Sequence, residues 1–217
     1  MAKKFAHEAS YRGDNILARL ARETIVVCGA GALGSNLIDM LARQGASSLR
    51  AIDMDRVDEH NVNTQLYGDA DVGAMKVNAL QSRIFRDTGV EVETFNKEMD
   101  SGNIKKFLKG ADLVVDVFDN RASRQLVHEF CVKSKVPCLH AGMFEDYGEV
   151  AWDKEYYVPA DAPEGVQDVC DYPLARNLVM MVTTIAAEEI VNFCTADNPR
   201  LTSWSITLKD LAVRAYR

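Results

Sequence analysis

The feature that most constrains the fold is a glycine-rich turn set between a short apolar run and a helical pattern. The apolar run 24–28 (TIVVC) leads into the turn 29–34 (GAGALG), and a helical pattern continues to Gln44. A second apolar run, 49–52, ends at Asp53. This order of strand, glycine turn, helix, strand and acid predicts a mononucleotide-binding unit.

Each glycine of the turn has a physical role in such a unit. Gly29, Gly31 and Gly34 allow a tight turn and a close approach of the backbone to a phosphate, toward which the first N–H groups of the helix point. Asp53 would end the second strand, where its carboxylate accepts hydrogen bonds from a ribose. The alternative is a turn that only packs a helix on a sheet. An acid at about 20 residues' distance favours nucleotide binding.

The rest of the chain alternates strand and helix patterns, which predicts an α/β fold: a Rossmann-like, doubly wound, mainly parallel sheet with antiparallel strands at the C-terminal end. Residues 1–22 are expected to be a polar arm followed by a short helix capped by Asp14. Segments 54–73 and 153–173 are expected to be long loops, the second an active-site or crossover loop. Strands are predicted at 24–28, 49–52, 89–95, 111–117, 136–140, 149–152, 203–206 and 211–213, and helices at 14–22, 35–44, 74–86, 102–108, 122–134 and 174–193.

Length and charge limit the classes of function. The 217 residues favour a single domain over 1–217. The net charge of −7 argues against non-specific binding to nucleic acid or to an anionic membrane. The most apolar helical stretch, 178–191, contains two threonines and two glutamates and is expected to be too short and too polar to span a bilayer. With no secretory leader visible, a cytoplasmic protein is expected.

The five cysteines are odd in number and include no C-x-x-C pair, so they predict reduced thiols and no zinc site. Cys28 lies on the predicted first strand and is expected in the core, as are Cys131, Cys138 and Cys194. His140 ends a predicted strand and is expected to be a hydrogen-bonded structural histidine.

The polar residues after the glycine turn indicate which nucleotide is bound. A dehydrogenase needs only the glycine turn, a ribose acid and a hydride-transfer site. This chain adds a second acid, an Asn/Gln loop, a lysine at a helix start and an aspartate after a later strand, all at the carboxyl edge of the predicted sheet. A lysine that neutralises phosphate together with an aspartate that holds Mg²⁺ suggests a triphosphate. These residues are Asp53, Asp55, Asn61, Gln65, Lys76 and Asp119.

Together these motifs resemble the ThiF/MoeB/HesA family, which belongs to the superfamily of ubiquitin-activating enzymes. The resemblance runs from about residue 10 to about residue 195, and the set is specific although each motif alone is not. Its members adenylate the C-terminal carboxylate of a ubiquitin-like or sulfur-carrier protein and release pyrophosphate. The motifs are Gly29-x-Gly31-x-x-Gly34, Asp53-x-Asp55, Asn61-x-x-x-Gln65, Val72-Gly73-x-x-Lys76 and Asp119-Asn120.

The resemblance implies roles for individual residues and for partners. Asp53, with Asp55 nearby, would bind the ATP ribose, and Asn61 and Gln65 would line the nucleotide loop. Lys76 would bind phosphates and stabilise charge during attack on the α-phosphate. Asp119 would bind Mg²⁺. The implied cofactors are ATP and Mg²⁺ without zinc, and the implied partner is a small carrier protein with a Gly-Gly end.

Two further residues carry implied catalytic roles. Tyr11-Arg12 resembles a shortened Tyr-x-Arg-Gln element, whose arginine enters the ATP site of a partner subunit, which implies a homodimer. Cys170, in Cys-x-x-Pro before a long helix, lies where members of the superfamily carry the cysteine that forms a thioester. The helix start would lower the thiol pKa, whereas Asp168 and Asp171 oppose this.

The chain departs from the family pattern at Thr64, where members usually have an arginine. A phosphate-binding cation would then come from elsewhere, such as Arg56, Arg121 or Arg124. Three alternatives remain: an NAD(P)-dependent oxidoreductase, a degenerate scaffold that binds a ubiquitin-like protein without activating it, and adenylation of a different carboxylate. Two of the candidate residues also have an interpretation without function. Lys76 would then be a solvated lysine at the start of a helix, and Asp119 would only cap the helix that follows it.

Overall fold

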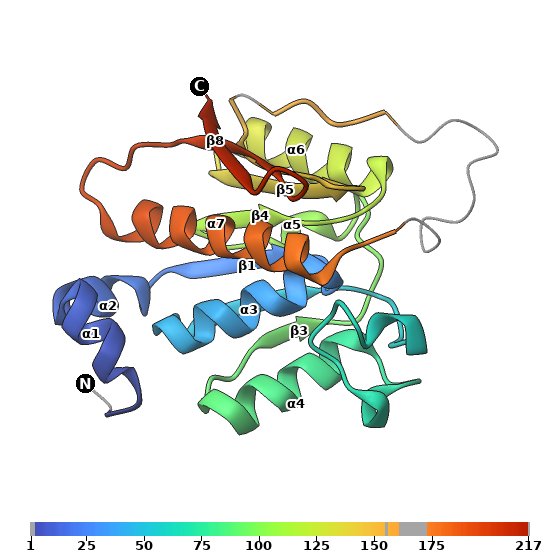
Figure 1. The fold of residues 1–217 in the computed structure, drawn as a ribbon, viewed down its shortest axis with the longest axis horizontal. Helices are drawn as coiled ribbons and strands as arrows, with labels where there is room; N and C mark the ends of the chain where they lie inside the picture. Colours follow the sequence, from blue (N-terminus) through green and yellow to red (C-terminus); the bar gives the residue numbers. More distant parts are fainter. Residues whose placement is uncertain (1–2, 155, 161–172, 217) are drawn as a thin grey trace.

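The computed structural model describes residues 3–154, 156–160 and 173–216. It shows an α/β fold with one eight-stranded sheet in the order β3-β2-β1-β4-β5-β6-β7-β8 (Figure 1). The strands are β1 (Thr24–Cys28), β2 (Ser48–Ile52), β3 (Glu93–Phe95), β4 (Leu113–Asp116), β5 (Cys138–Phe144), β6 (Tyr147–Trp152), β7 (Ser203–Thr207) and β8 (Ala212–Tyr216). The helices are α1 (Ala6–Arg12), α2 (Asp14–Leu20), α3 (Ala32–Gln44), α4 (Lys76–Thr88), α5 (Ile104–Phe107), α6 (Arg121–Ser134) and α7 (Arg176–Thr195).

The direction of the strands confirms the predicted sheet. Strands β1 to β5 pair in parallel, and β6, β7 and β8 are added by antiparallel pairing. Because β1 pairs with both β2 and β4, the strand order reverses beside β1. In open α/β sheets, ligands bind outside the carboxyl ends of the strands at such a reversal. The glycine turn after β1 and the segment after β4 both lie there.

Two apolar cores hold the helices on the sheet. One core lies under α3, α4 and α7, and the other lies under α5 and α6. In β4, Leu113 and Val115 face the first core, whereas Val114 faces the second. A parallel strand buried on both faces reads as a continuous apolar run, which explains the pattern of this segment.

Helix α7 (Arg176–Thr195) extends beyond both ends of the apolar stretch 178–191. Among the described residues it is the one helix whose length and composition would suffice to cross a membrane, so the expectation that it is too short was wrong on those criteria. It packs against α3 and the strands β5 and β6, and most of it is buried inside the molecule. Its apolar character therefore fits a core helix.

The N-terminal segment differs from its prediction. Residues 3–12 are helical rather than a polar arm, with a short 3₁₀ turn (Lys3–Phe5) before α1. Asp14 is the first residue of α2 and not its cap. The capping position is occupied by Gly13, which has a φ of 94° and no side chain to accept a hydrogen bond. Leu17 and Leu20 of α2 are buried, so this helix is anchored on the core.

Other differences concern the ends of elements. Strand β5 continues past His140 to Phe144, because residues 139–144 pair with β6 in an antiparallel hairpin. The apolar pattern of residues 136–140 alone could not indicate this longer strand. Strand β3 is shorter than predicted, since only residues 93–95 pair with β2. The loop 54–73 contains two 3₁₀ turns, Glu59–Asn61 and Asp69–Asp71.

Candidate nucleotide site

The glycine turn has the close contacts that a phosphate-binding turn requires. Gly29 has a φ of 109°, a conformation that favours glycine. A Cβ on Gly34 would lie 2.0 Å from the carbonyl oxygen of Gly29, so only glycine allows α3 to start this close to β1. A Cβ on Gly31 would meet nothing within 4 Å. Gly31 therefore faces open space at the start of α3.

This contrast predicts opposite results for two alanine substitutions. Gly34→Ala should destabilise the fold by about 1–3 kcal/mol, because the new methyl group collides with fixed backbone. Gly31→Ala should leave the melting temperature nearly unchanged but weaken nucleotide binding roughly ten- to hundredfold, since its methyl group occupies the space where the backbone approaches a phosphate. Thermal melting and calorimetric titration of both variants measure the two effects. Full binding by folded Gly31→Ala would show that this face of the turn binds no phosphate.

Asp53 fixes the glycine turn from the adjacent strand. Its Oδ2 accepts a hydrogen bond of 2.7 Å from the N–H of Ala30, and its Oδ1 accepts one of 2.8 Å from the N–H of Asp55. Burial raises the pKa of this carboxyl group, and the positive charge of Lys76 partly opposes the rise. Tyr67 donates its hydroxyl to the carbonyl of Ala30 over 2.7 Å. Asp53 thus has a structural role in the turn, and its contact with a ribose stays a prediction.

Lys76 is a buried cation at the start of α4. Its side chain is only 10% exposed, and its Nζ lies 2.9 Å from Oδ2 of Asp55. Burial works to lower the pKa of this amine, but the charges of Asp53 and Asp55 outweigh it, with a smaller part from Asp119, and the pKa is raised. The alternative of a solvated helix-start lysine is therefore wrong. Lys76 is charged and is held by acids at the edge of the sheet.

The loop between β2 and α4 contributes a buried and unpaired acceptor. Asn61 accepts a hydrogen bond from the N–H of Asp58 over 2.9 Å and so holds the 3₁₀ turn. Thr64 is 6% exposed, and its carbonyl accepts a bond of 2.9 Å from the side chain of Asn36. The buried Oε1 of Gln65 has no hydrogen-bond partner within the described residues. This oxygen is therefore free to accept a hydrogen bond from a ligand donor.

Asp119 follows β4 and is exposed. It does not cap α6, since Asn120 occupies that position and accepts a hydrogen bond of 2.9 Å from the N–H of Ser123. The alternative of a simple cap is therefore wrong. Its negative charge contributes to the raised pKa of Lys76 and of Arg124, so it belongs to the same electrostatic cluster. An exposed carboxylate offers the oxygen ligands that a hard divalent cation prefers.

Three arginines were candidates to supply the phosphate-binding cation that is missing at Thr64, and they differ in whether their guanidinium groups are free to bind phosphate. Arg56 donates to the carbonyl of Gly73 over 2.7 Å. Arg124 is 8% exposed and donates to the carbonyl of Ala141 over 2.8 Å, so its guanidinium is committed to the fold. Arg121 is exposed at the first turn of α6.

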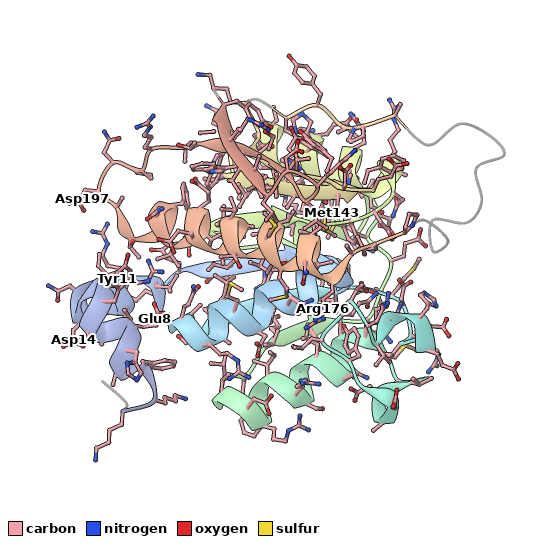
Figure 2. All side chains as sticks on the ribbon, in the orientation of Figure 1. Glu8, Tyr11, Asp14, Met143, Arg176 and Asp197 are labelled. Atoms are coloured by element: carbon pink, nitrogen blue, oxygen red, sulfur yellow. The ribbon has the colours of Figure 1, made fainter. Side chains whose placement is uncertain are left out.

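Sequence reasoning missed a further cation, Arg176. It is the first residue of α7, and its Nη1 donates to the carbonyl of Asn63, the residue before Thr64, over 3.3 Å. Figure 2 shows Arg176 at the end of α7 away from Asp197. No local pattern links residues 113 positions apart, so only the tertiary structure shows it. Arg176 places a positive charge next to the position where the family arginine is missing.

Arg12 lies at the other end of the molecule. Its guanidinium contacts Glu188 of α7 through 3.0 and 2.6 Å bonds and Glu8 through a 2.7 Å bond. Glu188 stands 12 residues along α7 from Arg176, which is about 18 Å in a helix. Figure 2 shows Glu8 and Tyr11 on the side away from Arg176. The structure therefore does not bring Arg12 to the glycine turn of its own chain.

The cysteines divide into buried residues and one outside the described part of the chain. Cys28, Cys131, Cys138 and Cys194 are buried, as expected. Burial raises the pKa of Cys28 and Cys138 and raises that of Cys194 to about 12, so these thiols stay protonated. Cys170 lies outside the described residues, and its catalytic role stays a prediction.

The sequence matches a known protein family over most of its length. The model of the ThiF family matches residues 5–214. The chain is 35% identical over 135 residues to the sulfur carrier protein adenylyltransferase of Thermus thermophilus, covering 61% of this chain and 50% of that protein. It is 32% identical over 133 residues to the SAMP-activating enzyme E1 of Haloferax volcanii, covering 60% and 49%. The chain thus spans about half the length of these curated relatives.

Solved structures share the fold at low sequence identity. Escherichia coli MccB, crystallised with MccA-N7isoASN, superimposes with a TM-score of 0.83 at 16% identity and covers 99% of this chain and 71% of that one. The structure of PaaA gives a TM-score of 0.82 at 18% identity, covering 100% and 74%. Since the family model matches residues 5–214, nearly the whole chain, the protein belongs to the ThiF family.

Proposed function

We propose that this chain uses ATP to adenylate the C-terminal carboxylate of a small ubiquitin-like or sulfur-carrier protein that ends in Gly-Gly. One observation carries the proposal. A charged, buried lysine stands beside Asp53 and Asp55 at the carboxyl edge of the sheet, and Asp119, in the segment after β4, adds to its raised pKa. A nicotinamide cofactor requires neither the lysine nor the second carboxylate, whereas a triphosphate with a divalent cation uses both.

The chemistry joins two anions, a carboxylate and a triphosphate, which repel each other unless cations stand between them. Lys76 binds phosphate oxygens and stabilises the charge that develops when the carboxylate attacks the α-phosphate. Arg176 adds a positive charge beside Thr64. Asp119 would hold Mg²⁺, which supplies further neutralisation of phosphate charge. The unpaired Oε1 of Gln65 would accept a hydrogen bond from the nucleoside.

The names of the relatives support the same class of reaction. The matched proteins include adenylyltransferases for sulfur carriers, and one solved MccB structure contains ATP. The direct test is ATP–pyrophosphate exchange in the presence of a small ubiquitin-like protein that ends in Gly-Gly. Exchange should require ATP, Mg²⁺ and the intact carrier end. Equal exchange with a carrier that lacks its final glycine would contradict the proposed acceptor.

We further propose a homodimer in which Arg12 of one subunit serves the ATP site of the other. To reach the ATP site of the partner, Arg12 must leave its pairs with Glu188 and Glu8, in which its side chain is 12% exposed. Tyr11 beside it is 83% exposed, and Met180, Met181, Thr184, Ile185 and Val213 line an apolar hollow of about 300 Å³. Both features provide apolar surface for a second subunit.

A mixing experiment tests this arrangement. Arg12→Ala and Lys76→Ala chains should each be inactive alone. A mixed dimer should recover exchange at the one site that keeps Lys76 and receives an intact Arg12 from the other chain. If the mixture stays inactive although mass measurement shows mixed dimers, Arg12 does not act across the interface.

Cys170 is the proposed acceptor of the activated carrier. The thiolate would attack the acyl-adenylate, form a thioester with the carrier carboxylate and release AMP. Cys170→Ala should therefore leave pyrophosphate exchange within about twofold of the wild type, while a reductant-sensitive conjugate disappears. Non-reducing gels with and without thiol measure the conjugate, and Cys194→Ala is the matched control at a buried cysteine. A conjugate that survives in Cys170→Ala would place the thioester on another residue.

A further inference from the structure

A cluster of two histidines and a carboxylate lies on the face of the sheet that α6 covers. His140 of β5 is 1% exposed, and its Nε2 lies 2.7 Å from Oδ1 of Asp153. His128 of α6 places its Nδ1 3.1 Å from the same oxygen. The two ring nitrogens and the oxygen all lie within 4.8 Å of one another. Three side chains from different elements thus converge on one point.

We propose that His128, His140 and Asp153 bind one divalent transition-metal ion of the zinc class. Imidazole nitrogens suit zinc, cobalt and nickel, whereas Mg²⁺ prefers oxygen ligands. The set of two imidazoles and one carboxylate matches protein zinc sites that keep a further position open. The site is therefore chemically separate from the one at Asp119, and it does not depend on the proposed adenylation.

The other ring nitrogen of His140 supports this assignment. Its Nδ1 lies 2.9 Å from Oδ2 of the fully buried Asp116. A neutral imidazole has one N–H, so donation to Asp116 leaves the lone pair of Nε2 directed at Asp153 and available to a metal ion. Metal-binding histidines in proteins usually donate their second nitrogen to a carboxylate in this way.

The surroundings hold the ligands in place and keep a route to solvent. Tyr156 stacks on His140 with ring centres 3.7 Å apart, and its hydroxyl is 3.0 Å from Nη1 of Arg124. The side chains of His128 and Asp153 are each 23% exposed, so an ion can enter from their side. The expectation of no zinc considered only paired cysteines. It did not consider histidines 12 residues apart and an aspartate 13 residues further on.

Titration with Co²⁺ tests the site, because cobalt reports its ligands through its visible and ultraviolet bands. The chelator-treated wild type should bind one Co²⁺ per chain with visible bands of a nitrogen- and oxygen-ligated ion, and excess Zn²⁺ should displace it. His128→Ala should bind at least about tenfold more weakly. His7→Ala, at an exposed histidine of α1, should bind as the wild type does.

A second variant, Asp153→Asn, keeps the test valid if His128→Ala fails to fold. Asp153 is partly exposed, and asparagine has nearly the same shape as aspartate. Zn²⁺ should raise the melting temperature of the wild type and of His7→Ala but not that of folded Asp153→Asn or His128→Ala. Two results would overturn the proposal. One is equal Co²⁺ binding by the wild type and His128→Ala. The other is an intense ultraviolet charge-transfer band, which would assign the ion to a cysteine thiolate.

Discussion

Lys76→Met is expected to lower ATP–pyrophosphate exchange by about 10²–10³-fold, because it removes a fixed cation from the place where two anions must meet. Methionine keeps most of the unbranched stem, so packing at the start of α4 changes little. The loss should appear in the rate at saturating ATP as well as in the apparent affinity, since the charge acts on the transition state.

The control for this prediction is Lys133→Met, which removes an exposed lysine near the end of α6. It should retain full exchange. Removing Lys76 also leaves Asp53 and Asp55 without their cation, so thermal melting must show that the variant is folded. A folded Lys76→Met protein with wild-type exchange would mean that the buried lysine only neutralises its two acids.

Asp119→Asn is expected to cause a loss of similar size, about 10²–10³-fold, with a different signature. The amide keeps the shape but has lost the charge that attracts Mg²⁺, so part of the activity should return at high Mg²⁺ concentration. Stability should change little, because Asp119 is exposed and Asn120 provides the cap of α6.

Asp210→Asn, at an exposed aspartate between β7 and β8, is the matched control and should keep the Mg²⁺ dependence of the wild type. The exchange rate of both variants is measured over a range of Mg²⁺ concentrations. An unchanged Mg²⁺ dependence in Asp119→Asn would remove this residue from the metal site.

Periodicity and turn chemistry predicted the part of the fold that depends on neighbouring residues. The run 24–53 folds as predicted because its strand, glycine turn and helix are each specified locally, and the close contact of Gly34 with Gly29 requires glycine. The residues Lys76 and Asp119 were found because they lie directly at the start of a helix and after a strand. Their shared electrostatics follow once the parallel strands place their carboxyl ends at one edge.

The features that sequence reasoning missed depend on contacts between distant segments. Arg176 meets Asn63 only because α7 packs against α3 and begins beside the loop after β2. Likewise, His140 appeared to be a single structural histidine. The hairpin of β5 and β6 and the turn of α6 are needed to bring Asp153 and His128 to it. Helix α1 was missed because it is short and none of its residues is buried, so it has no apolar stripe.

The most direct test of the central claim is the intact mass of the carrier protein after incubation with this chain, ATP and Mg²⁺. The account predicts a carrier that gains one adenylyl group at its C-terminus, with pyrophosphate released in equal amount, and no such product with Lys76→Met. An unmodified carrier, with ATP unbound and NAD(P)H bound in its place, would contradict the account and return the glycine turn to a hydride-transfer enzyme.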